Sequence, residues 1–238
     1  MKKHAILKTS MLAGAMAASV TVAQAATVNV DLGPNGAGTY VGTGAAPDAG
    51  TIWNNVSFAA SGVSITVPTA EVTGLVDSTG VATGMGFRLE SISPSTSTTQ
   101  FRSFGNGGTT DLQGDRLFSR NGALGTVVIS GLDDAKTYDI YLYTAGFNTN
   151  YTIGGITKNA DASSTSNGTF VEGEDYVLFS GISSTSNEIS IGVQDGVGAL
   201  DSFGVLSGFQ VVSVPEPSST VMIGAGLAFL GLRRKRHA

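Results

Sequence analysis

The sequence contains no cysteine, and its only two histidines, His4 and His237, lie at opposite ends of the chain. The lack of cysteine excludes disulfides, thiolate metal sites and thiol nucleophiles. Residues 26–214 also lack histidine, which excludes a Ser-His-Asp triad and a His-based zinc site there. Because most hydrolase mechanisms need one of these groups, we expect this part of the chain to be non-enzymatic.

Charged residues are scarce and mostly acidic. They make up 13% of the chain, against roughly 25% in ordinary soluble proteins. Residues 26–214 hold six basic and 17 acidic residues, a formal net charge of −11. A nucleic-acid-binding protein needs clustered positive charge to displace counterions from phosphates. We therefore expect no nucleic-acid partner.

The N-terminus has the pattern of a secretory signal. Three lysines within the first eight residues precede the apolar run Met11–Val22. The run leads into Ala23-Gln24-Ala25, the small-x-small pattern that signal peptidase accepts. We predict a helical signal peptide over residues 1–25, with cleavage before Ala26. The alternative is a buried core helix, against which Gly14 and the basic flank argue.

The C-terminus combines three features in order. The segment Val214-Pro215-Glu216-Pro217-Ser218 is followed by the apolar run Val221–Leu232 and then by Arg233-Arg234-Lys235-Arg236. The run is short for a membrane span, since a comfortable helix needs about 20 residues. The basic cluster should act as a cytoplasmic stop, which leaves the preceding domain on the far side of the membrane. We predict a short, transient transmembrane helix.

These three features closely resemble the PEP-CTERM sorting signal of Gram-negative bacteria. The resemblance implies that residues 215–238 are a sorting signal processed by an exosortase, a membrane-embedded protease. It further implies a surface or extracellular destination and an association with exopolysaccharide and biofilm. It implies no biochemical activity, because unrelated domains carry the same tail. A plain C-terminal membrane anchor is the alternative.

The central residues 26–214 show short alternating or apolar runs separated by turn residues, with no sustained helical period. Asn-Gly steps at 35–36, 106–107, 121–122 and 167–168 are strong turn signals. We predict an all-β domain, an antiparallel β-sandwich, with a hairpin turning at Gly154-Gly155. The runs Val127-Val128-Ile129 and Ile140-Tyr141-Leu142 resemble those of galactose-binding-type jelly rolls. The expected strands are 27–32, 63–67, 85–92, 125–130, 137–144, 151–158, 169–171, 176–180, 188–193 and 208–214.

Carbohydrate binding is one candidate function of this domain. Exposed aromatic rings would stack on sugars, and the candidates are Trp53, Tyr141 and Tyr143. Arginine side chains would hold the sugar hydroxyls, and the candidates are Arg102, Arg116 and Arg120. The alternative for a single tryptophan in a β-sandwich is a place in the core.

Two further sites depend on carboxylates. A structural calcium ion would suit the aspartates in glycine-rich surroundings, which are Asp31, Asp111, Asp115, Asp195 and Asp201. A glycosidase needs a carboxylate pair and no histidine. The candidates are Glu172 and Glu174, then Glu90 and Glu188, although residues 172–175 look more like an acidic turn. We expect no catalytic residue and no cofactor beyond this candidate calcium.

Three hypotheses follow for the exported domain. The first is a structural protein of the cell surface or extracellular matrix. The second is a module that binds exopolysaccharide or plant glycan, and the third is a glycosidase or lyase. The partners expected on the export route are signal peptidase, exosortase and, through the C-terminal helix, the membrane.

Overall fold

The computed structural model describes residues 25–47, 49–91, 101–105, 111–119, 124–161, 169–196 and 203–214. These residues form strands, turns and bends but no helix, so the predicted all-β class is confirmed. In these described ranges no helix has the length and apolar character required to cross a bilayer. The predicted signal helix and C-terminal transmembrane helix lie outside the described residues.

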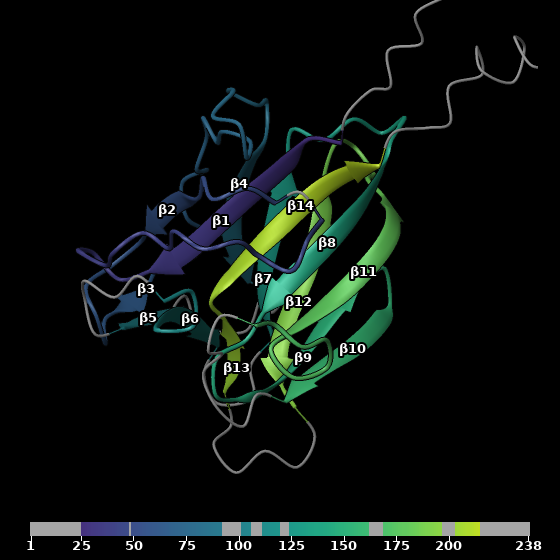
Figure 1. Ribbon diagram of the computed structural model, residues 1–238. Helices are drawn as coiled ribbons and strands as arrows, with labels where there is room; N and C mark the ends of the chain where they lie inside the picture. Colours follow the sequence, from purple (N-terminus) through teal and green to yellow (C-terminus); the bar gives the residue numbers. More distant parts are fainter. Residues whose placement is uncertain are drawn as a thin grey trace, which may run out of the picture. The chain divides into compact units, whose positions relative to one another are not determined.

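The first sheet, which we call the front sheet, has the strand order β11-β8-β14-β1-β2 (Figure 1). Its neighbours pair antiparallel except β1 and β2, which run parallel with Val30 opposite Asn54. The sheet is antiparallel as predicted except at this edge, where a long connection over residues 34–53 lets the chain return in the same direction. The strands are β11 (Tyr176–Ser183), β8 (Thr137–Tyr143), β14 (Gly208–Val214), β1 (Thr27–Gly33) and β2 (Asn54–Ser57).

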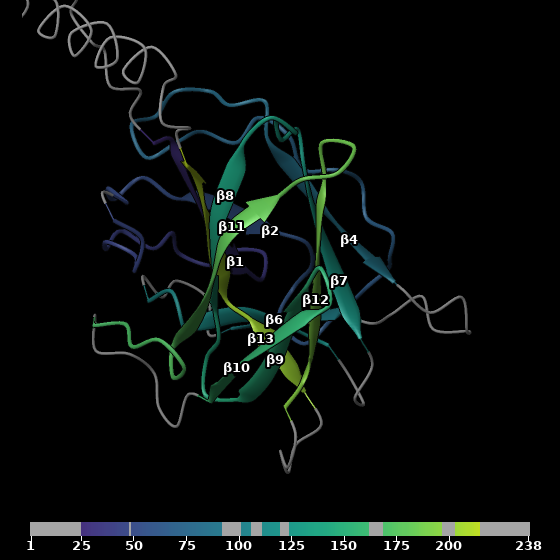
Figure 2. The same ribbon diagram turned by 90° about the vertical axis from the view of Figure 1, so that its right-hand side faces the viewer.

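The second sheet, the back sheet, has the order β10-β9-β12-β7-β4 and is antiparallel throughout. The hairpin between β9 and β10 turns at Gly154-Gly155, as predicted, and both glycines have positive φ (57° and 81°). Figure 2 shows β8 of the front sheet and β7 of the back sheet on opposite sides of the molecule. The strands are β10 (Ile156–Asp161), β9 (Asn148–Ile153), β12 (Ile189–Asp195), β7 (Gly125–Ser130) and β4 (Gly86–Ser91).

One apolar core fills the space between the front and back sheets. Alternate residues of β8 face it, namely Tyr138, Ile140 and Leu142, and Val127 and Ile129 of β7 meet them from the other side. This alternation follows from the two-residue period of a strand. The two sheets therefore make a sandwich, and its jelly-roll subtype remains a prediction.

A third, smaller sheet has the order β13-β6-β5-β3. It contributes Phe101, Leu117 and Ile65 to the same core. Only Ser207 separates β13 from β14, so the chain passes from the small sheet directly into the centre of the front sheet. The strands are β13 (Gly204–Leu206), β6 (Asp115–Ser119), β5 (Phe101–Gly105) and β3 (Ser64–Ile65).

Some strands differ from the prediction. Residues 169–171 form no strand and instead lead into a turn that ends at Tyr176. Four strands were not predicted from the sequence: β2, β5, β6 and β13. Two of the missed strands, β5 and β6, carry the outward-facing side chains of the candidate site described below.

Candidate functional site

The structure brings together the three aromatic rings that were expected to stack on sugars, but it buries them. Trp53 is 6% exposed, Tyr141 is 5% exposed and Tyr143 is fully buried. They form a second apolar cluster with Leu112 and Val212, on the outer face of the front sheet. The prediction of an exposed platform at these three residues is wrong, and the alternative placement of the tryptophan in a core is the observed one.

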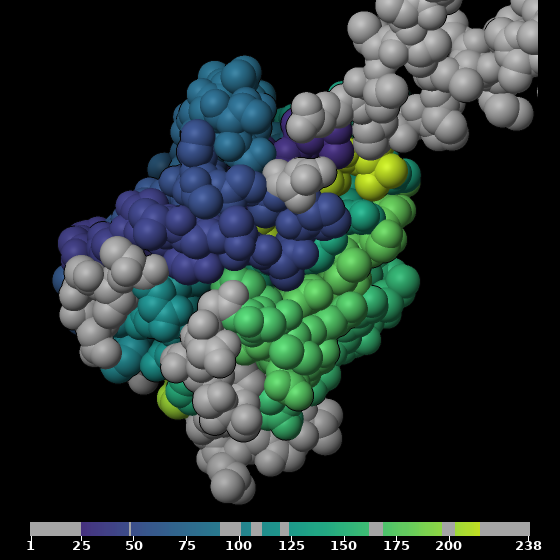
Figure 3. All heavy atoms as spheres, viewed as in Figure 1, coloured from purple at the N-terminus to yellow at the C-terminus, as the bar shows by residue number. Residues whose placement is uncertain are grey.

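The segment over residues 34–53 contributes to this burial by lying across the outer face of the front sheet, and the rings of Phe170 and Tyr176 pack on the same cluster. The Trp53 indole donates a hydrogen bond to the Gly42 carbonyl (2.9 Å). The Tyr143 hydroxyl donates to Gln210 Oε1 and accepts from the backbone N–H of Ala45 (2.6 Å). Figure 3 shows this segment, in violet and blue, spread over the front of the molecule. Each buried polar group of the two rings thus has a partner, as burial requires.

A different aromatic surface lies on the outer face of the small sheet. In β5 the buried residues alternate with Arg102 and Phe104, and in β6 they alternate with Arg116 and Phe118. Antiparallel pairing sets Arg102 opposite Phe118 and Phe104 opposite Arg116. Two arginines and two phenylalanines therefore share one face in a checkerboard pattern.

Two further phenylalanines extend this face. The ring centre of Phe118 lies 6.2 Å from that of Phe104 and 5.1 Å from that of Phe203. Phe147 lies 6.2 Å from Phe203. The guanidinium carbon of Arg116 connects the two ends of this row of rings, because it lies 5.1 Å from the ring centres of both Phe104 and Phe147. We call these five residues together with Arg102 the phenylalanine–arginine patch.

The patch is partly open to solvent. Phe104 is 40% exposed, and its three fellow phenylalanines and both arginines are half-buried. Arg116 donates one long hydrogen bond to the Ala145 carbonyl (3.4 Å). Burial lowers the pKa of Arg116, and the carboxylate of Asp115 acts in the opposite direction. A guanidinium nevertheless stays protonated at neutral pH, so the patch presents a fixed cation between two aromatic faces.

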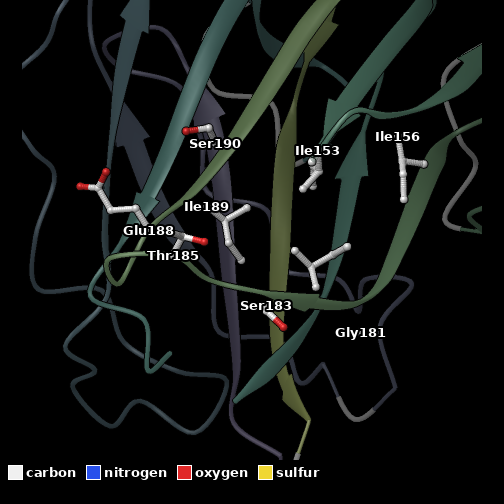
Figure 4. Close-up of a pocket in the computed structure, with 10 residues that line it drawn as sticks. Ile153, Ile156, Gly181, Ser183, Thr185, Glu188, Ile189 and Ser190 are labelled. Atoms are coloured by element: carbon white, nitrogen blue, oxygen red, sulfur yellow. The ribbon is translucent and has the colours of Figure 1, made fainter. Parts of the chain in front are cut away.

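A groove of about 480 Å³ lies elsewhere, where the β9–β10 hairpin meets β11 and the start of β12 (Figure 4). Its walls are mainly isoleucines and small polar residues, with the carboxylate of Glu188 at one end and Ile156 at the other. Glu188 accepts two hydrogen bonds from Arg88, at 2.7 and 3.1 Å. Arg88 also contacts Glu90 at 2.5 Å. Arg88 lowers the pKa of Glu188, so this carboxylate is an ion-pair partner and is unsuited to act as an acid.

The other candidate glycosidase residues do not form a pair in a cleft. Glu172 and Glu174 lie exposed in the turn that precedes β11, as the acidic-turn interpretation predicted. The backbone N–H groups of Glu174 and Asp175 donate to the Val171 carbonyl, which closes that turn (3.2 and 2.8 Å).

Asp31 is a buried carboxylate with a strongly perturbed pKa. It is 3% exposed, and its Oδ2 atom accepts a hydrogen bond from the Tyr40 N–H (2.8 Å). Burial raises the pKa of Asp31 to about 7, and the charges of Asp115 and Asp111 act in the same direction. In the part of the chain that the structure describes, no three acidic or histidine side chains are grouped so that they could hold a metal ion. The calcium site expected at Asp31, Asp111, Asp115 and Asp195 stays a prediction, and Asp201 lies outside the described residues.

Most of the remaining predicted residues belong to the two ends. Ala25 begins the described residues, and Ala23 precedes them. Arg120 lies outside them as well, as do both parts of the predicted C-terminal signal. These are the motif Pro215, Glu216 and Pro217, and the basic cluster Arg233, Arg234, Lys235 and Arg236.

Comparison with known proteins identifies the C-terminal segment. Residues 213–236 match the PEP-CTERM protein-sorting motif. The chain is therefore a PEP-CTERM motif-containing protein, as the resemblance implied. The motif implies sorting by an exosortase, export, and a cell-surface or extracellular location. The comparison with curated proteins gives no match.

Proposed function

We propose that the chain is a non-enzymatic protein of the cell surface or extracellular matrix, and that its β-sandwich binds polysaccharide at the phenylalanine–arginine patch. The observation that carries this proposal is the patch itself. Aromatic rings open to solvent can stack on the apolar C–H faces of sugar rings, while arginines donate hydrogen bonds to sugar oxygens. A protein sorted to the surface would meet polysaccharide there.

The non-enzymatic part of the proposal is supported by the chemistry of residues 26–214. This region contains neither histidine nor cysteine. Among the described residues, the candidate glutamates are either exposed in a turn or paired with Arg88. Because catalysis by a carboxylate pair needs two such groups flanking one bond, these glutamates favour a binding role over hydrolysis.

The experiment is polysaccharide binding by the full chain in mild detergent, compared with Phe104→Ala. Phe104 is chosen because its exposed ring can contact a ligand and contributes little to the core. Ile156→Ala is the matched control, since Ile156 is also a large exposed apolar residue on a strand (57% exposed) and lies outside the patch. We expect Phe104→Ala to weaken binding about tenfold, as loss of one stacked ring would.

Ile156→Ala should bind like the unmodified protein. Equal binding by all three proteins would overturn the proposed role of the patch. Release of reducing sugar ends from the polymer, in an amount proportional to the protein, would overturn the non-enzymatic reading.

A further inference from the structure

The charges on the patch identify the class of saccharide that fits it. Among the described residues, Arg88 forms ion pairs with two glutamates, Glu90 and Glu188. Lys136 forms an ion pair with Asp133. Lys158 donates to the Leu178 carbonyl (2.5 Å) and lies over the Phe179 ring. The two arginines of the patch, Arg102 and Arg116, take part in none of these ion pairs.

These two cations are unusual in a domain of net charge −11. The charge of Asp115 reaches Arg116, but Asp115 is 2% exposed and lies on the inner side of β6, so the carboxylate does not occupy the outer face beside Arg116. An arginine whose charge is not matched by a carboxylate on its own face is available to an anion from outside. Electrostatic complementarity of this kind selects partners more strongly than it raises affinity.

The position of Arg116 also suits a planar anion. Its guanidinium carbon lies 5.1 Å from two phenylalanine ring centres, so contacts with the rings help to hold the side chain. Its hydrogen bond to the Ala145 carbonyl is long (3.4 Å). A guanidinium has five N–H donors in a fork that matches a carboxylate, so donors remain for a ligand.

From this geometry we infer that the patch binds saccharide chains whose sugars carry carboxylate groups. This inference rests on the proposed polysaccharide-binding function and adds the charge of the ligand. The exposed Phe104 ring contacts the C–H face of one sugar, and Arg116 beside it contacts that sugar's carboxylate. Arg102 lies on the same face, opposite Phe118, and meets the carboxylate of a neighbouring sugar. Densely charged nucleic acid is disfavoured because the domain as a whole is acidic.

The test compares polygalacturonate with its methyl-esterified form, which has the same sugar chain without the charges. We expect the full chain to bind the acidic polymer about tenfold more tightly, and we expect this preference to shrink as salt is raised. Arg116→Lys keeps the charge but loses the planar fork, and Arg102→Gln removes a charge on the same face. Both variants should weaken binding of the acidic polymer by a larger factor than they weaken binding of the esterified polymer, because only the acidic polymer loses a charge partner.

Lys136→Gln is the matched control, because it removes one basic charge outside the patch. Thermal unfolding of each variant checks that the fold is intact. Equal binding of the two polymers by the unmodified protein would overturn the inference while leaving polysaccharide binding in place. Absence of binding to the acidic polymer would overturn the inference outright. A loss of binding in Lys136→Gln equal to that in Arg102→Gln would overturn it as well, because the preference would then come from the overall charge of the protein and not from the patch.

Discussion

Ala26 and Ser213 are hydrogen-bonded to each other although 187 positions separate them. The Ala26 N–H donates to Ser213 Oγ (3.0 Å), and the Ser213 N–H donates to the Ala26 carbonyl (3.0 Å). Ala26 follows the predicted signal-peptidase site, and Ser213 is the first residue that matches the sorting motif. The folded domain therefore presents its two junctions side by side.

The sorting motif that follows this junction gives the first prediction. Replacing Pro215-Glu216-Pro217 with three alanines should leave the sandwich folded but block removal of the tail, because the motif marks the chain for exosortase. We expect the variant to accumulate in the membrane fraction at a higher mass, as measured by mass spectrometry of fractionated cells. Replacing Ser218 and Ser219 with alanine is the control and should leave processing intact. Normal processing of the triple-alanine variant would contradict the role of the motif.

Tryptophan fluorescence distinguishes the two aromatic regions. Trp53 is the only tryptophan of the chain and is 6% exposed, so its emission should be blue-shifted and protected from acrylamide. Saccharide binding at the patch should leave this emission unchanged, because the patch contains only phenylalanine and arginine. A saturable change in emission on titration with polygalacturonate would instead place the sugar beside Trp53.

Tyr143→Phe should destabilise the sandwich. The Tyr143 hydroxyl is the shared partner of Gln210 Oε1 and the Ala45 N–H, and the side chain is fully buried. Loss of a buried hydroxyl that satisfies two groups should lower the free energy of unfolding by about 1–3 kcal/mol. Urea unfolding measures this change. Tyr40→Phe, which removes a hydroxyl bonded at the surface to the Thr43 carbonyl, is the control and should have a much smaller effect.

Asp31 should make the stability fall as the pH rises. Its folded-state pKa of about 7 exceeds the ordinary value of 3.8, so the folded protein retains a proton that the unfolded chain has already lost. The free energy of unfolding should therefore decrease from about pH 4 to about pH 7 and level off above it, by at most about 4 kcal/mol. Asp31→Asn should remove this contribution and be more stable than the unmodified protein at pH 8.

Asp77→Asn provides a control of opposite sign for the Asp31 prediction. Hydrogen bonds from the Thr79 hydroxyl and from the N–H groups of Val81 and Thr79 lower the pKa of Asp77. Its stabilising contribution is present at neutral pH and is lost as the pH falls through the lowered pKa. Asp77→Asn should thus be less stable than the unmodified protein at pH 8. If Asp31→Asn were also less stable there, the buried carboxylate would be a net stabiliser and the prediction would fail.

The sequence predicted the central strands well because their hydrophobic pattern is regular. The strand expected over residues 125–130 matches β7, and the one expected over 137–144 is β8 to within one residue. The alternation in β8 also assigned Tyr138, Ile140 and Leu142 to one face and Tyr141 and Tyr143 to the other, as observed. Pattern alone could not show that the second face is covered too, because the cover comes from a distant, irregular segment.

The patch escaped sequence analysis for a related physical reason. In β5 the polar residue Ser103 points inward and is fully buried, whereas the apolar residue Phe104 points outward. This reverses the usual arrangement of polar and apolar residues, so the run from Phe101 to Gly105 does not show the expected alternation. Departures of this kind are expected where a surface is built for binding. Arg116 was a candidate from the sequence, but only the pairing of β5 with β6 shows which phenylalanines surround it.

The position of β14 has a consequence for the order of events during export. Among the described residues β14 is the last strand, and it lies between β8 and β1, the first strand of that part of the chain. The front sheet therefore cannot close until nearly the whole domain has passed through the translocation channel. Such long-range pairing makes folding slow and late. We therefore expect the chain to remain unfolded during export and to complete the front sheet only when β14 pairs with β8 and β1.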